Sequence, residues 1–340
     1  MTQKTLKKES QFFKELYPIA LELQDLAPWQ WMYETDLFGV KLPDSDTPYF
    51  ASIMGSSGQF NAFSFYDGVH AANQFLQIQE HPGATRPEDI MLIPHLMVSF
   101  DDRKFLQLDE RIQIEELGYD LKERIQWPVF QQIIPGHPHL FPTLDKLRDL
   151  IPLLEQTLHI ARRTRHEEFA FIERTKEGVS GLFRISESGQ WRDGYTEMSS
   201  TYEPAPIPAS GRLAAQLNRI PKQELVLEVD LAMMLSPVMD KDPEYFPFVL
   251  LLVEKDTGYI IHFELLTPHP SVGEMVAGSG RKLLKSMIEK NIHPKEIQIR
   301  SSRLQPVLNK SLTGTSVRLE VRWKLPAVEE AMASLMDFLG

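Results

Sequence analysis

The sequence contains no cysteine, and this excludes several kinds of site at once. Disulfide bonds, thiolate zinc sites, iron–sulfur clusters and a cysteine nucleophile are all ruled out. Long apolar runs are also missing, and the first residues, with Lys4, Lys7 and Lys8 ahead of Gln11 and Phe12, lack the apolar core of a signal peptide. We therefore expect a protein that is not exported, that stays in the cytoplasm and that has no membrane partner.

The remaining composition is that of a folded globular protein, with 42% apolar and 24% charged residues. A chain of 340 residues exceeds the size that one hydrophobic core usually serves, so two domains are expected. The net charge of −11 is uneven: residues 1–168 hold 16 basic and 25 acidic side chains, whereas residues 281–324 hold 11 basic and 3 acidic. The basic stretch is a possible contact for an anionic partner, and a solvated surface is the simpler interpretation.

Hydrophobic periodicity predicts an acidic α+β domain over residues 1–168. The predicted helices span residues 8–25, 69–79, 109–117 and 143–163. The predicted strands span residues 31–40, 49–54, 60–65 and 91–100, with Gly55 to Gly58 as a hairpin turn. The dense prolines of residues 127–142 predict an ordered loop without regular structure. Residues 169–203 predict a meander of short strands that completes this domain.

The second half has a different order of elements. Pro204, Pro206 and Pro208 mark residues 204–219 as a linker, followed by a domain over residues 220–340. Its predicted elements are strands 225–231, 248–253 and 259–266, helix 272–291, strand 296–300, helix 304–312, strand 316–323 and helix 327–339. This βββαβαβα order, with the last two strands parallel to the first, is the plan of the RNase H-like fold. The expected class is therefore α+β, with an N-terminal α+β domain and a C-terminal RNase H-like α/β domain.

Within this domain, the stretch from Leu225 to Ser302 resembles the core of retroviral-integrase-type transposases. Asp230 lies in the first strand, and residues 294–297 lead into the fourth. The resemblance implies two divalent metal ions, held by an Asp on the first strand, an Asp just after the fourth and a carboxylate on a late helix. Asp230 matches the first of these, but Ser302 stands where the second is required.

The late helix offers Glu329 and Glu330 for the third carboxylate, although a glutamate early in a helix also complements the helix dipole. Losing the second carboxylate should weaken metal binding strongly, because hard cations need charged oxygen ligands. We therefore expect a degenerate core without metal or cofactor, and a binding or scaffold protein rather than an enzyme. Two alternatives are a metal-dependent nuclease or phosphodiesterase with an atypical ligand set, and a peptide-binding module. The simpler interpretation of Asp230 is a solvent-facing strand residue.

Five basic side chains near the end of the chain are candidates for binding an anion, with a protein or a nucleic acid as the partner: Arg281, Lys282, Lys285, Arg300 and Arg303. Gly278 to Lys282 are partly similar to a phosphate loop, but they lie inside a predicted helix, which favours close helix packing. Gly55 to Gly58 lack the spacing of a nucleophile elbow. His95, His137 and His139 are possible metal ligands, although the flanking prolines favour a rigid loop.

Aromatic residues of the front half are suited either to core packing or to lining a groove: Trp29, Trp31, Tyr33, Trp127 and Phe130. The whole chain also resembles a group of uncharacterised bacterial proteins with two domains of unknown function. The matching stretches are residues 31–40, 48–58, 127–136, 225–231, 246–266 and 324–330. This resemblance implies the pairing of two domains and transfers no activity.

Overall fold

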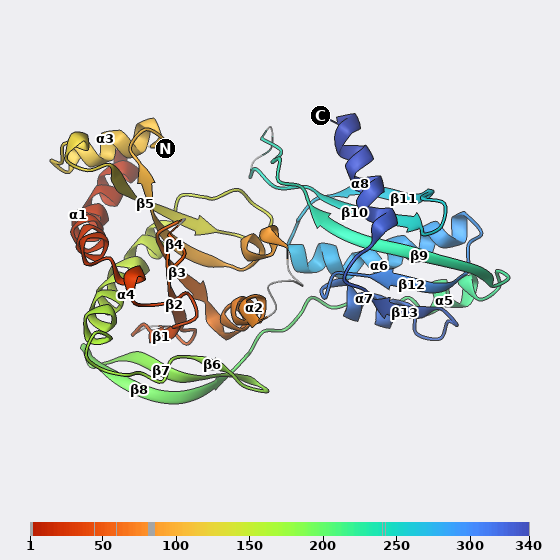
Figure 1. The fold of residues 1–340 in the computed structure, drawn as a ribbon, viewed down its shortest axis with the longest axis horizontal. Coiled ribbons are helices and arrows are strands. Elements are labelled where there is room, and N and C mark those ends of the chain that lie inside the picture. Colours follow the sequence, from red (N-terminus) through yellow and green to blue (C-terminus); the bar gives the residue numbers. More distant parts are fainter. Residues whose placement is uncertain are drawn as a thin grey trace. The chain divides into compact units, whose positions relative to one another are not determined.

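The computed structural model describes residues 3–43, 45–58, 60–80, 86–239, 241 and 243–339. The chain divides into two compact units (Figure 1). Unit 1 comprises Met1–Ile134 and His139–Tyr202, and unit 2 comprises Pro135–Pro138 and Glu203–Gly340. Each unit combines helices with one β-sheet, so the predicted α+β class is confirmed. In the described part, no helix has both the length and the apolarity needed to span a membrane.

Unit 1 is built on an eight-stranded sheet with the order β5-β4-β3-β2-β1-β7-β6, in which β8 also pairs with β7. Its strands are β1 (Phe38–Lys41), β2 (Tyr49–Met54), β3 (Ala62–Asp67), β4 (His95–Asp102), β5 (Gln126–Ile133), β6 (Glu173–Arg174), β7 (Gly178–Glu187) and β8 (Gln190–Ser199). Strands β1 and β7 are parallel, and the other pairs are antiparallel. The predicted hairpin turn is confirmed, because the amide of Gly58 donates to the carbonyl of Gly55 at 2.9 Å.

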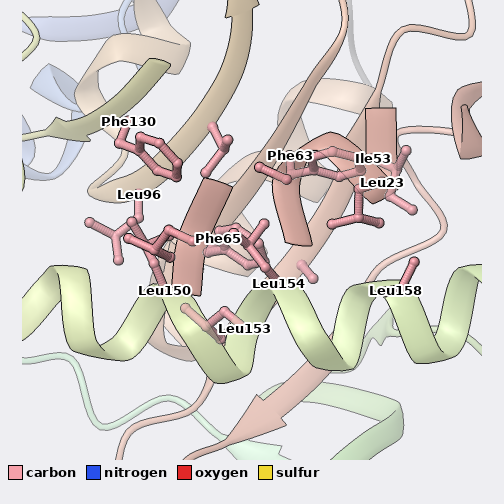
Figure 2. Packing of buried hydrophobic residues seen from close by; sticks show 14 of the residues in the cluster. Leu23, Ile53, Phe63, Phe65, Leu96, Phe130, Leu150, Leu153, Leu154 and Leu158 are labelled. Atoms are coloured by element: carbon pink, nitrogen blue, oxygen red, sulfur yellow. The ribbon is translucent and has the colours of Figure 1, made fainter. Parts of the chain in front are cut away.

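The helices of unit 1 are α1 (Gln3–Leu26), α2 (Gly68–Glu80), α3 (Leu108–Glu116) and α4 (Leu144–Arg163). Helices α1 and α4 pack together and against the sheet, since their apolar residues recur at helical spacing. Figure 2 shows the leucines of α4 pointing at the phenylalanines of β3. Helix α2 packs into a second apolar cluster through Phe75, beside Phe50 and Tyr66. The core of unit 1 thus surrounds the sheet.

Three predicted segments of unit 1 differ in the structure, each for a local reason. The strand expected over residues 31–40 begins only at Phe38, because the residues before it form turns, in one of which the amide of Asp36 donates to the carbonyl of Tyr33 at 3.0 Å. The strand expected over residues 91–100 begins at His95, after a 3-10 helix over Pro87–Leu92. The loop expected over residues 127–142 was partly wrong, since β5 is a regular strand containing Pro128. Strand β5 is at the edge of the sheet, where a residue without an N–H group is tolerated.

Unit 2 follows the predicted order of elements, which is confirmed. After α5 (Gly211–Leu217), which lies inside the stretch expected as a linker and packs on α6, the elements are β9 (Gln223–Met233), β10 (Phe248–Glu254), β11 (Ile260–Leu266), α6 (Val272–Glu289), β12 (Pro294–Ile299), α7 (Leu304–Ser311), β13 (Arg318–Val321) and α8 (Pro326–Leu339). The sheet order is β11-β10-β9-β12-β13. Strands β9, β10 and β11 form an antiparallel meander, whereas β12 pairs in parallel with both β9 and β13.

Helices α6 and α8 lie on opposite faces of this sheet. Helix α8 packs on Val249, Leu251 and Val253 of β10. Leu250 points to the other face and pairs in register with Glu264 of β11, whose carboxylate contacts Lys282 of α6. Because β9 and β12 are parallel neighbours, their carboxyl ends lie at the same edge of the sheet. The first turn of α8 contacts this edge, because Glu329 reaches Arg300 after β12 and the amide of Val328 donates to Glu228 of β9.

Candidate functional site

Three elements of unit 2 bring two carboxylates and one guanidinium together. Asp230 comes from β9, Glu329 from the first turn of α8, and Arg300 directly follows β12. Arg300 stands level with Asp230 because Ile299 pairs in parallel register with Val229. Its Nη2 lies 3.1 Å from Oδ2 of Asp230, and its Nη1 lies 3.0 Å from Oε1 of Glu329. We call these three residues the Arg300 centre.

Asp230 is fully buried, so the interpretation of it as a solvent-facing residue was wrong. Register explains the burial: Asp230 pairs with Leu251, which points toward α8, so both side chains lie on the face that α8 covers. Besides Arg300, the Asp230 carboxylate accepts a hydrogen bond at 2.9 Å from the amide of Leu231. Burying an ionised carboxylate is costly unless cations and hydrogen-bond donors compensate it, so the contact with the Arg300 guanidinium stabilises the centre.

Glu228 is a second buried acid on the same face of β9, and it was absent from the sequence-based candidates. Its Oε2 accepts the amide of Val328 at 3.1 Å, so it caps the first turn of α8, while no partner in the described part of the chain reaches Oε1. Burial raises the pKa of the Glu228 carboxyl, against the lowering effect of the Val328 and Ala327 amides. The signal was present in the sequence, because Glu228 and Asp230 are two residues apart in an alternating strand.

This raised pKa makes the stability of unit 2 depend on pH in a defined direction. A carboxyl whose folded pKa lies above its unfolded value contributes fully at low pH, and that contribution is lost as the pH rises through the folded pKa. The variant Glu228→Gln has no charge to bury, so its stability relative to wild type should increase between pH 4 and pH 8. Urea denaturation across this range measures the difference. A difference that stays constant, or that falls with pH, contradicts the assignment.

A row of polar contacts continues from the Arg300 centre along β12. Lys255 donates to Oε1 of Gln298 at 3.1 Å, and Gln298 donates to Oε1 of Glu296 at 2.6 Å. Glu296 is buried, which alone would raise its pKa, but hydrogen bonds from Gln298 and Arg318 hold the pKa below its usual value. The face of the sheet beside α8 therefore carries acids that are each matched to a donor.

Where the integrase-type resemblance implies a metal-binding set, the structure has an ion-pair arrangement. Asp230 and Glu329 do converge, as that resemblance implies for two of its carboxylates, but the cation between them is Arg300. Ser302 is exposed in the turn before α7, and Glu330 is exposed on α8. Over the ranges that the structure describes, no three His, Asp or Glu side chains gather as a metal site. A guanidinium at hydrogen-bonding distance from both carboxylates would have to move before a metal ion could reach them.

The five candidate anion-binding residues are not gathered on one surface. Arg281, Lys282 and Lys285 lie on α6, whereas Arg300 reaches the opposite face of the sheet. Lys282 is paired with Glu264, and Arg300 with the two carboxylates of its centre. Arg303 precedes α7. The basic stretch of the sequence is thus divided between two faces.

Two glycine motifs serve the fold. A side chain at Gly280 would bring its Cβ to 2.2 Å from Oγ of Ser311 and 3.1 Å from Val307 of α7, so the predicted close helix packing is confirmed. Gly55 and Gly58 both have positive φ angles, 132° and 75°, in the β2–β3 turn. Ser56, inside this turn, donates a hydrogen bond to the carboxylate of Glu34.

His95, His137 and most of the aromatic candidates also have structural partners. Nδ1 of His95 lies 2.8 Å from the carbonyl of Ile93, and Nδ1 of His137 lies 2.6 Å from the carbonyl of Glu244. Core packing is confirmed for Trp127 and Phe130, which are buried. The other three aromatic candidates have different surroundings. Trp29 packs on Phe63 and Phe100, Trp31 donates a hydrogen bond to Thr164 at 3.1 Å, and Tyr33 is exposed.

The fold and the Arg300 centre together define a two-unit α+β protein. The sheet of its second unit carries a buried carboxylate that is paired with an arginine. Two domain models match the chain: residues 13–181 match a domain of unknown function (DUF7309), and residues 213–336 match another domain of unknown function (DUF6930). No curated protein and no solved structure matches it. The chain therefore carries two domains of unknown function, as the second resemblance implied, and its function is unknown.

Proposed function

We propose that unit 2 is an RNase H-like domain in which Arg300 takes the place of the catalytic metal ions, and that the protein acts by binding or as a scaffold. The strand order β11-β10-β9-β12-β13 supports the fold assignment, since it joins an antiparallel meander to two strands parallel to the first. The observation that carries the functional part is that the guanidinium of Arg300 bridges the carboxylates of Asp230 and Glu329. The proposal places the protein in a bacterial cytoplasm.

The mechanism of this proposal is electrostatic. Two-metal phosphoryl transfer needs cations that bind the attacking and leaving oxygens while the carboxylates hold them in place. At the Arg300 centre the carboxylates already contact a cation, and that cation is a side chain of the protein. A guanidinium brings no exchangeable water and has no vacant coordination position. Arginine also keeps its charge throughout the physiological range of pH. The centre thus fastens β9, β12 and α8 together and engages the two carboxylates that would otherwise be available to a metal ion.

A manganese-supplemented hydrolysis screen tests this proposal. Single-stranded DNA, single-stranded RNA and bis(p-nitrophenyl) phosphate are suitable substrates, with Asp230→Asn as the matched background control. We expect wild type and Asp230→Asn to give the same rate, because neither holds a metal at the centre. Hydrolysis by wild type that Asp230→Asn abolishes would instead establish the alternative, a nuclease or phosphodiesterase with an atypical ligand set.

The charges of unit 2 favour a protein over a nucleic acid as the partner. Five of the eleven basic residues between 281 and 324 are already paired with carboxylates: Lys282, Lys295, Arg300, Arg318 and Arg322. A phosphate backbone would have to compete with these internal partners. We therefore expect no retention on single-stranded DNA or RNA columns at low salt. Retention that falls steeply with added salt would favour a nucleic acid instead.

A further inference from the structure

Strand β11 forms an open edge of the sheet of unit 2. It pairs with β10 on one side and ends the strand order on the other. An edge strand presents unpaired N–H and C=O groups, which are a template for pairing with another strand. Proteins commonly protect such edges with charged side chains, prolines or bulges. The two edges of this sheet differ in that respect.

The opposite edge, β13, has the usual protection, whereas the α8 face of β11 is apolar. Strand β13 carries Arg318 and Glu320, which form ion pairs. On β11, Phe263 and Leu265 point to the same face as Leu251 and Val249, with which they pair, and they are 40% and 52% exposed. On the face that α8 covers, β13 therefore presents charged side chains at its edge, whereas β11 presents apolar ones.

The order of side chains in β11 is self-complementary. From Ile260 to Leu266 the strand reads Ile-Ile-His-Phe-Glu-Leu-Leu. When a second copy is turned by 180° about Phe263, His262 of each strand stands opposite Glu264 of the other. Phe263 then stands opposite Phe263. Leu265 and Leu266 stand opposite Ile261 and Ile260, the end of β11 at which its register with β10 shifts. Opposite charges, aromatic pairs and aliphatic pairs are the favourable cross-strand neighbours of antiparallel sheets.

We propose that β11 is the dimerisation strand of this protein, pairing antiparallel with β11 of a second copy around a twofold axis at Phe263. Such an interface is isologous, so it closes at two copies and joins the two five-stranded sheets into one continuous sheet. The inference concerns a surface other than the Arg300 centre and is independent of the function proposed for that centre.

The side chain of His262, on the other face of β11, also favours a second copy of the chain as the partner. Nε2 of His262 is buried and makes no hydrogen bond in the described part of the chain, although it lies 3.4 Å from Oε2 of Glu264. Glu264 also contacts Lys282 of α6. In the dimer, Glu264 of the second copy stands directly opposite His262 and provides an acceptor. The pairing thus adds a complementary charge contact on each side of the axis.

Because the chain has no cysteine, single cysteine substitutions test the pairing and its register directly. In Phe263→Cys the two thiols belong to directly opposed residues, whose Cα atoms lie about 4.5–5.5 Å apart, within the range of a disulfide. In Leu265→Cys the two thiols are separated by roughly 13 Å, four residues of strand. We expect mild oxidation to give a covalent dimer of Phe263→Cys and a monomer of Leu265→Cys on non-reducing gels. No covalent dimer of Phe263→Cys, or equal amounts from both variants, would overturn the proposal.

Sedimentation equilibrium provides a second test that does not depend on disulfide chemistry. We expect wild type to dimerise and His262→Glu to weaken the dimer about tenfold, since the axis creates two like-charged pairs with Glu264. His262→Lys should strengthen it, because it keeps a positive charge at every pH used. Trp323→Asp is the matched control, as it changes an exposed side chain, 73% accessible, just after the opposite edge strand. A monomeric wild type, or a dimer weakened by Trp323→Asp and not by His262→Glu, would contradict β11 pairing.

Discussion

Replacing Arg300 by methionine should lower the free energy of unfolding of unit 2 by about 3–5 kcal/mol, the cost expected when one partner of a buried ion pair is removed. Methionine keeps much of the aliphatic stem but removes the guanidinium that contacts the Asp230 carboxylate, which is only 1% exposed. Glu329 contributes little to this loss, because its side chain is 45% exposed and surface pairs are worth about 1 kcal/mol or less. Urea denaturation followed by circular dichroism measures the change.

The matched control is Arg322→Met, since Arg322 pairs with Glu320 and is 51% exposed. We expect this variant to lose about 1 kcal/mol or less. The double variant Asp230→Asn with Arg300→Met should recover much of the stability lost by Arg300→Met alone, because a neutral amide replaces the buried carboxylate that has lost its contact with Arg300. Equal losses for Arg300→Met and Arg322→Met, or no recovery in the double variant, would show that Arg300 is not the essential partner of Asp230.

Leu154→Ala should lower the free energy of unfolding of unit 1 by about 2–5 kcal/mol, the range for deleting a buried leucine side chain. Leu154 lies on α4, is fully buried and points into the cluster formed with Phe63 and Phe65 (Figure 2). The loss combines the apolar surface that is no longer buried with the cavity that remains. Urea denaturation monitored by tryptophan fluorescence suits this unit, since Trp127 belongs to the same cluster.

Leu108→Ala is the matched control for this core substitution. Leu108 is the first residue of α3 and is 74% exposed, so the same chemical change should alter stability by about 0.5 kcal/mol or less. A loss for Leu154→Ala no greater than that for Leu108→Ala would contradict the packing of α4 on the sheet. The pair separates the effect of burial from the effect of the substitution itself.

The sequence was most informative where one periodic pattern extended through a whole element. In unit 2, the alternation of β9 and the continuous apolar run of β10 predicted these two strands, because β9 buries one clearly apolar face and β10 is covered on both faces. Pro128 had the opposite effect, since proline is usually a loop residue and only the edge position of β5 makes it compatible with a strand. That edge position depends on the whole sheet and cannot be read locally.

The candidate site was predicted only in part, for a related reason. Asp230 and Glu329 were singled out by their positions in the order of elements, but Arg300 was assigned to a group of anion-binding residues. Arg300 is 70 residues from Asp230 and 29 residues from Glu329, so no local pattern joins them. The available signal was that an arginine directly precedes Ser301 and Ser302, where the resemblance required an acid. Register then places that arginine beside Asp230.

A calorimetric titration of manganese into the purified chain tests the central claim most directly, namely that the guanidinium of Arg300 occupies the position of a metal ion. Wild type and Asp230→Asn should give the same small heats, because Arg300 already contacts both carboxylates of wild type and occupies the space between them. Saturable binding of manganese by wild type that Asp230→Asn removes would show that a metal displaces the guanidinium, and would contradict the account.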